Sequence, residues 1–404
     1  MRIAWFSPLP PTASGIADYS FELLPLIAEG ADVEAFTPDA RAVRAPSGIP
    51  VLEPSAFEHR ADRYDAVFYH LGNNPFHEYV YREALRRPGV AVLHEFVLHH
   101  LIEHLLFGQA RYELDVYERL VTQEYGPVGA RLAHLRAVGA FTEFEKFLFP
   151  LSGHVVSASR AAVVHTRGAR DVVMDASPGV PVHVIPHHAG HLPAQAEGVT
   201  RQEARRTLGL PADAFLVGQF GFLTRPKQPA AVLGGFSRFL ERRPDALLLV
   251  VGENQLGVGV EEMLRRRGLA GKVRMTGYVD LIRFALYLEA VDVVVNLRYP
   301  SAGEASGTFT RALAEGRAAI VSNLGSFGEY PDDVCLRVEV DGDQAAEVGA
   351  HLIRLAEDLP FKAELEERAR RYAEVQLDPG RCARMYLDVA ARVSAQDGLR
   401  TTSA

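Results

Sequence analysis

Short apolar runs alternate along the chain with longer segments in which apolar residues recur at helical spacing. The first run is RIAWF at residues 2–6, and a helical pattern follows with Ser14 as a candidate N-cap and Gly30 as a candidate stop. Further strand-length runs before residue 187 are VEAFT, AVFYH, VAVLH, HVVSAS and VHVIP. Alternation of this kind predicts an α/β fold with a parallel, doubly wound sheet.

The alternation stops twice. Residues 96–151 contain no strand pattern and several amphipathic helical stretches, which predicts a helical insertion in the first domain. Residues 186–200 are rich in His, Pro, Gly and Ala and predict a linker.

Beyond the linker the alternation restarts and predicts a second doubly wound domain. Helical patterns fall near residues 229–242, 259–268, 281–289 and 308–316, between the runs AFLVGQFGF, ALLLVVGE, KVRMTGYV, AVDVVVNL and AAIVSN. The chain is helical from residue 344 onward, and its polar end, residues 397–404, is expected to be disordered.

Composition narrows the class of protein. A length of 404 residues favours two domains, and a net charge of −8 argues against nucleic-acid binding. Two cysteines do not indicate a disulfide framework, so we expect a reducing compartment and a cytoplasmic location. The N-terminus lacks the apolar region of a signal peptide, and no 18-residue apolar stretch predicts a transmembrane helix.

Three loops join predicted strands to predicted helices, where doubly wound sheets bind ligands. In the first, SPLPPTASGIADYS, Gly15 would allow close backbone approach and Asp18 lies in the first helical turn. The alternative, which this loop taken alone favours, is an ordinary turn in which Asp18 complements the helix dipole.

The second loop, GQFGFLTRPKQP, places Arg225 and Lys227 at the start of a predicted helix. The chain has only four lysines, and that helix end is already positive, so an anion such as a diphosphate would resolve the conflict. The alternative is a solvated surface pair.

The third loop, PSAGEASGTFTRALAEG, places Ser306, Gly307 and Thr308 at another helix start, where amides could hold phosphate. Glu304 does not favour an anion and would instead accept hydrogen bonds from sugar hydroxyls, or cap the helix. Taken together, the second and third loops predict a nucleotide-sugar site.

Histidines gather in LHEFVLHHLIEHLLFG. His100 and His104 are four residues apart with Glu103 beside them, but the spacing does not match a metalloprotease motif, so we predict no metal site. His94 ends a predicted strand, which places it at the ligand edge of the first sheet.

From about residue 1 to residue 393 the chain resembles glycosyltransferase family 4, whose members are retaining enzymes with the GT-B fold of two Rossmann-like domains facing a cleft. The resemblance is carried by SPLPPTASGIADYS, VVSASRAAVVH, VIPHHAG, FGFLTRPKQP and, most specifically, by VRMTGYV…LYLEAVDVVVNLRYPSAGEASG…ALAEGRAAIVSN. It implies an acceptor-side domain at 1–190, a nucleotide-sugar domain at 191–378, and a C-terminal helix at 379–396 that packs back on the first domain.

The family's site residues are carried over only where motifs match. Lys227 would contact the donor diphosphate, Glu304 would hold sugar hydroxyls, and His94 would be the active-site histidine. Arg225 is predicted to contact the same diphosphate from its place in the loop. The resemblance further implies donor contacts from Gly15, Tyr278 and Val279. The predicted donor site also includes Gly221, Ser306, Gly307, Thr308 and Arg311, and Ser14 and Asp18 are predicted on the acceptor side.

Two positions depart from the family pattern. Phe222 stands where an Arg usually follows the phosphate-loop Gly, and Arg225 is a candidate replacement. Arg311 stands where a second Glu usually reaches the nucleotide ribose, in a segment one residue shorter.

The resemblance implies retaining transfer without an obligatory metal or other cofactor, in bacterial polysaccharide assembly. GDP-mannose is the first expected donor, a UDP-sugar the second, and the acceptor a glycan or lipid-linked glycan. Aromatic residues of the insertion would either pack its own core or make a peripheral contact with the inner face of a membrane. Two alternatives remain: a nucleotide-sugar epimerase of the same fold and a non-catalytic nucleotide-sugar binding protein.

Overall fold

The computed structural model describes residues 1–108, 111–190, 193 and 195–401. The chain divides into two compact units, and each draws on separate stretches of sequence. Unit 1 comprises Met1–His187, Ala302–Ala305 and Pro379–Ala404, and unit 2 comprises His188–Ser301 and Ser306–Asp378. The sequence places the domain boundary at residue 190 and assigns 302–305 to the second domain, whereas the structure assigns that short segment to unit 1.

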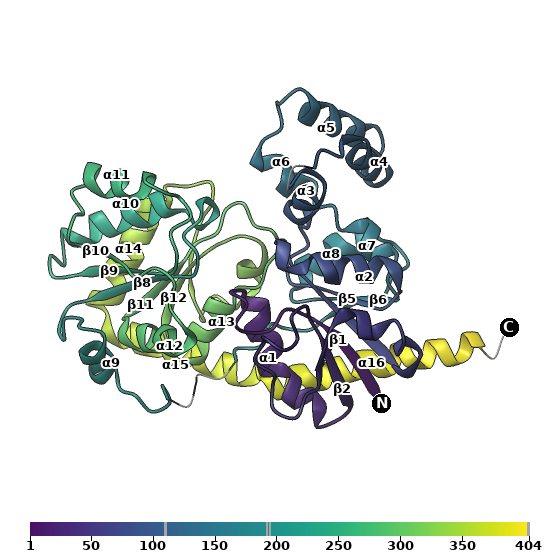
Figure 1. Cartoon of the computed structure of the whole chain (residues 1–404). Helices are drawn as coiled ribbons and strands as arrows, with labels where there is room; N and C mark the ends of the chain where they lie inside the picture. Colours follow the sequence, from purple (N-terminus) through teal and green to yellow (C-terminus); the bar gives the residue numbers. More distant parts are fainter. Residues whose placement is uncertain (109–110, 191–192, 194, 402–404) are drawn as a thin grey trace. The chain divides into compact units, whose positions relative to one another are not determined.

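Within its described residues, unit 1 contains a seven-stranded parallel sheet in the order β3-β2-β1-β4-β5-β6-β7 (Figure 1). Ile3 and Trp5 enter the core on one face of this sheet, whereas Ala4 and Phe6 enter the core on the other. The strands are β1 (Arg2–Phe6), β2 (Asp32–Phe36), β3 (Val51–Leu52), β4 (Ala66–Leu71), β5 (Val90–Leu93), β6 (Ala161–Val164) and β7 (Val182–Val184).

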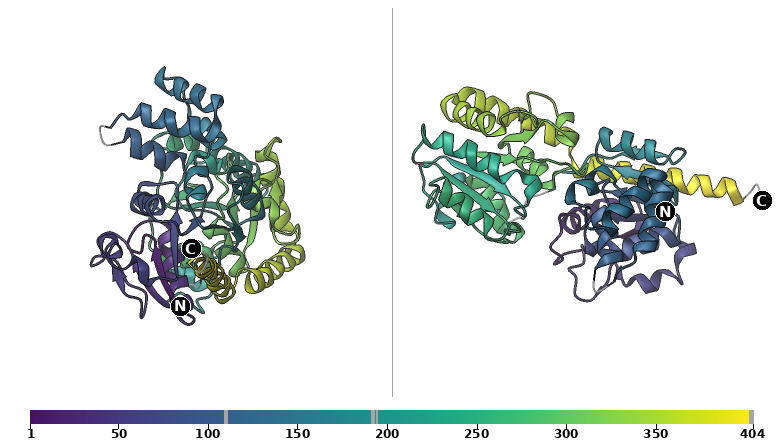
Figure 2. Two further views of the ribbon diagram at one scale, coloured as in Figure 1. Left: turned by 90° about the vertical axis from the view of Figure 1, so that its right-hand side faces the viewer. Right: turned by 90° about the horizontal axis from the view of Figure 1, so that it is seen from above.

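Helices cover both faces of the unit 1 sheet. On the Trp5 face lie α1 (Gly15–Ala28) and α16 (Pro379–Thr401), which pack against each other (Figure 2). Ser14 caps α1 as predicted, since its hydroxyl accepts from the N–H of Ile16. On the Phe6 face are residues of α2 (Glu78–Arg86), α7 (Gly153–Ser157) and α8 (Arg167–Ala176).

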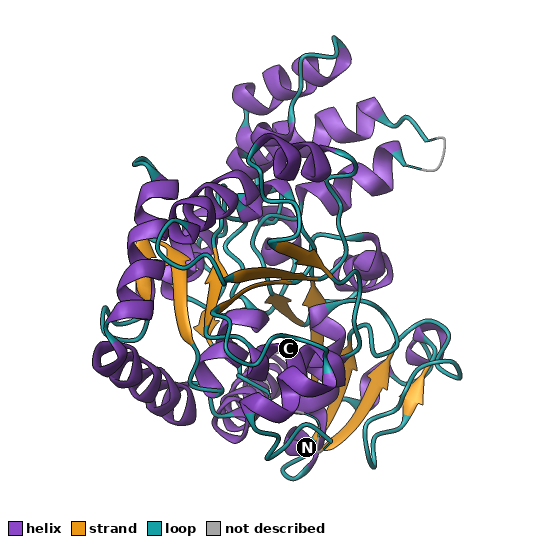
Figure 3. Cartoon of the chain, turned by 90° about the vertical axis from the view of Figure 1, so that its left-hand side faces the viewer, coloured by secondary structure: helices purple, strands orange, loops and turns teal. Residues whose placement is uncertain are grey.

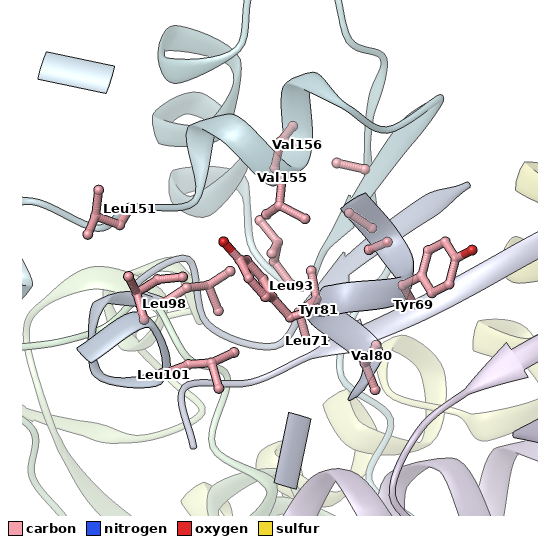
Figure 4. Close-up of a cluster of buried hydrophobic side chains, with 14 of the residues drawn as sticks. Tyr69, Leu71, Val80, Tyr81, Leu93, Leu98, Leu101, Leu151, Val155 and Val156 are labelled. Atoms are coloured by element: carbon pink, nitrogen blue, oxygen red, sulfur yellow. The ribbon is translucent and has the colours of Figure 1, made fainter. Parts of the chain in front are cut away.

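The predicted insertion between β5 and β6 is helical. Tyr81, Leu98, Leu101 and Leu151 share one buried cluster with the end of β5, so the base of the insertion continues the core of unit 1 (Figure 4). Its helices are α3 (His99–Phe107), α4 (Leu114–Tyr125), α5 (Pro127–Ala137) and α6 (Glu143–Leu148).

One predicted strand is wrong. The run HVVSAS falls in helix α7, and the strand that follows is β6, at Ala161–Val164. Val155 and Val156 are fully buried, so tertiary packing outweighs the β-propensity of the valine pair.

The described part of unit 2 contains a six-stranded parallel sheet in the order β10-β9-β8-β11-β12-β13, with helices on both sides (Figure 3). Its strands are β8 (Leu216–Phe220), β9 (Leu247–Val251), β10 (Val273–Met275), β11 (Val293–Asn296), β12 (Ala318–Ser322) and β13 (Leu336–Val338). Its helices are α9 (Arg201–Thr207), α10 (Pro229–Leu240), α11 (Gly259–Arg266), α12 (Leu281–Ala290), α13 (Gly307–Ala314), α14 (Gln344–Glu357) and α15 (Leu359–Gln376).

The described residues also include short 3-10 helices, which are η1 (Pro54–Phe57), η2 (Ala61–Arg63), η3 (Pro75–His77), η4 (Arg225–Lys227) and η5 (Gly325–Glu329). The described part of the predicted linker 186–200 carries neither helix nor strand, and residues 191, 192 and 194 lie outside the described residues. Helix α16 extends to Thr401, into the tail expected to be disordered, and residues 402–404 lie outside the described residues. Among the helices that the structure describes, none is both long and apolar enough to cross a membrane.

Candidate functional site

The turn after β8 brings a buried cation against the main chain. Gly221 adopts φ +79°, and a Cβ at this position would lie 2.6 Å from Lys227 Nζ and 3.9 Å from Thr308 Oγ1. Lys227 Nζ donates to the Phe220 carbonyl at 2.6 Å, and the side chain is only 8% exposed. The ammonium group is therefore fixed at the carboxyl end of the central strand, beside the start of α13.

A second loop packs on this turn. The N–H of Tyr299 donates to the Pro226 carbonyl at 2.7 Å, and the Gln228 side chain donates to the Tyr299 carbonyl at 2.6 Å. Gln228 itself lies in the left-handed region at φ 51° and links η4 to α10. The structure thus joins the TRPKQ and LRYPS loops, which the sequence predicts to share one ligand.

The start of α13 supplies unpaired amides at the same place. Ser306 is the N-cap, its hydroxyl accepting from the N–H of Phe309, and Gly307 and Thr308 form the first turn. First-turn amides of a helix have no partner within the helix, so they and Lys227 present positive charge toward one region.

The other predicted donor residues occupy varied positions in unit 2. Arg225 is exposed on η4, and Arg311 is half-buried on α13. Tyr278 is 62% exposed and Val279 is half-buried, both directly after Gly277, which has φ +71°.

The first predicted loop, between β1 and α1 in unit 1, is open. A Cβ on Gly15 would meet nothing within 4 Å. Ser14 and Asp18 are both half-buried, and Ser14 is engaged as the helix cap. This loop therefore leaves room at the amino end of α1.

Glu304 lies in unit 1, close in space to the residues that follow His94. The Ala302 carbonyl accepts from the N–H of Phe96 at 3.0 Å, and the Glu304 carboxylate accepts from the N–H of Ala302 at 2.7 Å. Gly303 has φ +78°, and its Cα packs against the Phe96 ring so closely that a Cβ would come within 2.1 Å of it. The segment thereby fixes the Glu304 carboxylate near the end of β5.

Sequence reasoning singled out His94 and missed two partners. His94 Nε2 lies 2.9 Å from His70 Nδ1, and His94 Nδ1 lies 3.1 Å from His165 Nε2. All three side chains are buried, and burial is the largest cause that lowers their pKa, to about 4 for His165. The missed signal is visible in the sequence, because AVFYH, VAVLH and AAVVH each place a histidine at or near the end of a strand.

Two further histidines of the cluster after β5, His99 and His100, have separate partners. His99 bonds to the Phe149 carbonyl and the Tyr117 hydroxyl, and His100 lies beside Asn73 and Glu143. In the part of the chain that the structure describes, no three His, Cys, Asp or Glu side chains are grouped to hold a metal ion.

The architecture identifies the fold class of the protein. Two parallel sheets of seven and six described strands, with flanking helices, form the two-domain, Rossmann-like GT-B fold. Residues 214–358, most of unit 2, match the family model described as glycosyl transferases group 1, so unit 2 contains a domain of this family. The fold expected from the sequence is confirmed, and the group 1 glycosyl transferase domain in unit 2 agrees with the expected family.

The comparisons extend to individual proteins. The chain is 30% identical over 172 residues to phosphatidyl-myo-inositol mannosyltransferase of Mycolicibacterium smegmatis, covering 41% of this chain and 43% of that protein. It spans less than half the length of the curated relatives that it matches.

Among solved structures the chain is similar to sucrose-phosphate synthase from Thermosynechococcus elongatus, with a TM-score of 0.67 and 15% identity over 98% of this chain and 100% of that one. It is also similar to HepE of Anabaena in complex with UDP and glucose, with a TM-score of 0.61 and 16% identity over the full length of both chains. At these identities the likeness concerns the fold.

Proposed function

We propose that this protein is a retaining glycosyltransferase that moves a sugar from a nucleoside diphosphate sugar to a hydroxyl of a glycan or lipid-linked glycan. The observation that carries the proposal is Lys227, buried against Gly221 beside the first turn of α13. A buried cation beside the first-turn amides of a helix is an arrangement suited to bind a diphosphate. The solved structure of HepE holds UDP and glucose, which supports a nucleotide-sugar donor.

The proposal gives each of these residues of unit 2 a role. As the bond between sugar and diphosphate breaks, negative charge grows on the leaving phosphate. Lys227, Arg225 and the amides of residues 306–308 would stabilise that charge, and such preorganised donors can lower a barrier by about 3 kcal/mol each. The acceptor hydroxyl attacks from the side of the departing phosphate, whose oxygen takes the proton.

Glu304 accepts hydrogen bonds in this mechanism and does not act as a nucleophile. Its carboxylate already accepts from the Ala302 N–H, which orients it. It would hold hydroxyls of the donor sugar, and no metal or other cofactor is required. GDP-mannose is the first donor to test because the relative from Mycolicibacterium smegmatis is a mannosyltransferase, and UDP-glucose is the second.

A thermal-shift panel of GDP-, UDP-, dTDP- and ADP-sugars, with and without Mg²⁺, tests donor binding. A ligand that binds only the folded protein raises the melting temperature. We expect one nucleotide to do so and Lys227→Ala to abolish the shift. Lys272→Ala is the matched control, because Lys272 also donates to a main-chain carbonyl, that of Pro244, at 2.6 Å.

Product analysis then separates transfer from its alternatives. With an acceptor glycan present, the proposal expects a glycosylated acceptor with the anomeric configuration of the donor. A donor altered without any acceptor would identify an epimerase. Binding without turnover across the acceptors tested would leave a binding protein. Equal shifts in wild type and Lys227→Ala would contradict the assigned diphosphate site.

A further inference from the structure

Three histidines form a row across the unit 1 sheet. They end or nearly end the neighbouring strands β4, β5 and β6, and the pairing of Leu71 with Leu93 and of Leu93 with Val164 places these ends in register. His70 contacts Trp5, so the row lies on the face covered by α1 and α16. Nδ1 of His70 reaches His94 at 2.9 Å, and His94 reaches His165 at 3.1 Å.

A carbonyl at one end determines the proton positions. His165 Nδ1 lies 2.8 Å from the Ile185 carbonyl oxygen, which can only accept, so Nδ1 carries the proton. In a neutral ring Nε2 of His165 then accepts, and His94 Nδ1 must donate to it. The same argument makes His94 Nε2 an acceptor and His70 Nδ1 its donor. Every ring of the row is therefore the Nδ1–H tautomer.

The row cannot carry a proton through. At one end, the Ile185 carbonyl accepts a hydrogen bond but cannot pass a proton to another group. At the other, His70 Nε2 is buried and has no hydrogen-bond partner among the described residues. The row can orient its middle member, since both nitrogens of His94 are already engaged.

Aromatic packing fixes the ring planes. Tyr19 of α1 lies edge-on to His94 at 4.8 Å between ring centres, and Trp5 of β1 lies 4.1 Å from His70. The Tyr386 hydroxyl of α16 lies 3.0 Å from that of Tyr19. The titratable groups that surround the row are Tyr19, His77, His187, Cys382 and Tyr386. Burial, and after it the neighbouring imidazoles, lower the pKa of His94, which keeps it neutral.

We propose that His70 and His165 are positioning residues for the transfer reaction: they lock His94 in the Nδ1–H tautomer and saturate both its nitrogens. The ring and main chain of His94 are then held in one position at the end of β5, and His94 neither gives up nor takes a proton during the reaction. This role rests on the proposed function, because His94 matters only if unit 1 meets the substrate.

Nitrogen NMR of the full chain tests the tautomers without any substrate. In protein carrying ¹⁵N-labelled histidine, long-range ¹⁵N–¹H spectra distinguish Nδ1–H, Nε2–H and cationic rings. We expect His70, His94 and His165 to be neutral Nδ1–H rings at pH 7, with assignments from single substitutions. An Nε2–H or cationic His94 would overturn the proposal.

Kinetics test the positioning role. His70→Asn keeps an N–H donor at the position of Nδ1, whereas His70→Leu removes it. We expect His70→Leu to lower kcat about ten- to a hundredfold at unchanged donor affinity, with most of the activity restored in His70→Asn. His351→Leu is the control, since His351 Nε2 also bonds to a carbonyl, that of Arg337, but lies in unit 2.

The outcomes are separable. Unchanged kcat in His70→Leu, or equal losses in His70→Leu and His70→Asn, would overturn the positioning role. If wild type transfers no sugar from any donor tested, the proposed function fails and the positioning role fails with it, while the spectra still decide the tautomers.

Discussion

At the residue scale, Gly221 matters both for the conformation of the backbone after β8 and for the position of the Lys227 ammonium group. Its positive φ and its closeness to Lys227 Nζ mean that no other residue fits without moving the ammonium group. The glycine therefore does more than form the turn after β8, because it leaves the space in which the ammonium group lies.

A substitution pair separates these two effects. Gly221→Ala and Gly209→Ala both place a side chain at positive φ, +79° and +62°, and each should cost about 1 kcal/mol of stability. Only at Gly221 does the added Cβ collide, since the position at Gly209 has nothing within 4 Å. We expect nucleotide affinity, measured by calorimetry, to fall in Gly221→Ala alone. Equal affinities would show that Lys227 is not held by this contact.

Acid should destabilise unit 1 through its buried histidines. Burial lowers the pKa of His77 and of His165 to about 4, below the ordinary 6.5. Between these values the unfolded chain binds protons that the folded chain does not, so stability is full above pH 6.5 and falls toward pH 4. Each of the two histidines should therefore lower the free energy of unfolding by about 2 kcal/mol when the pH falls to 5.

Urea unfolding at pH 7.5 and pH 5 measures this loss. His77→Asn keeps a donor for the His70 carbonyl, which His77 Nδ1 reaches at 2.8 Å, but does not titrate. We expect a smaller difference between the two pH values in this variant. An unchanged difference would mean that His77 does not contribute to the acid sensitivity.

The structural role of a single residue could be predicted where a short local motif determines it. The cap Ser14 and the start of α13 at residues 306–308 could be recognised from sequence because caps and small residues act locally. The row of histidines could not, because hydrogen bonding between His70, His94 and His165 depends on strand order and register. Only the recurrence of histidine at strand ends pointed to it.

At the element scale, the half-buried carboxylate of Glu124 adds polar contacts between the insertion and the sheet domain. Glu124 of α4 accepts from the N–H of Gly153 at 2.9 Å and lies 2.9 Å from His154 Nδ1. His154 Nε2 in turn lies 2.6 Å from the Tyr81 hydroxyl of α2. These contacts connect α4 of the insertion to α7, which follows the insertion, and to α2, which precedes it.

Removing this carboxylate should loosen the insertion. We expect Glu124→Ala to cost about 3 kcal/mol, because it leaves buried donors unpaired. Hydrogen exchange should quicken in α4 and α7, while β8 and its neighbours in unit 2 stay protected. Glu118→Ala, an exposed change on the same helix, is the control, and equal exchange in both variants would contradict the role of Glu124.

Most elements could be predicted because parallel strands buried on both faces are continuous apolar runs. The error at HVVSAS shows the limit of that signal. Two valines in sequence fit a buried strand or a buried helix turn equally well, and α7 is helical because the Ser159 hydroxyl and the core around Val155 favour it. The two-residue strand β3 is too short to leave a pattern.

At the scale of the whole molecule, each unit has cores of its own. The face of unit 1 that carries Trp5 is completed by α16, whose Tyr386 packs on Trp5 and Phe68. Phe236 lies in a separate core of unit 2. The two units should therefore respond separately to core substitutions.

Calorimetry should resolve this independence. Tyr386→Ala and Phe236→Ala each remove a fully buried ring and should each cost about 3–5 kcal/mol. We expect each variant to lower a different part of the thermal transition. If both variants shift the same single transition, the two units unfold as one.

The place of α16 in the sequence also affects how the protein is made. A ribosome releases residues 1–187 long before residues 379–401, although both belong to unit 1. Until α16 emerges, the side of the first sheet around Trp5 is covered by α1 alone, while the whole of unit 2 is already available to fold. The nascent chain is therefore exposed to aggregation at this face of the first sheet, and a chaperone that binds emerging chains should protect that apolar face until α16 has emerged.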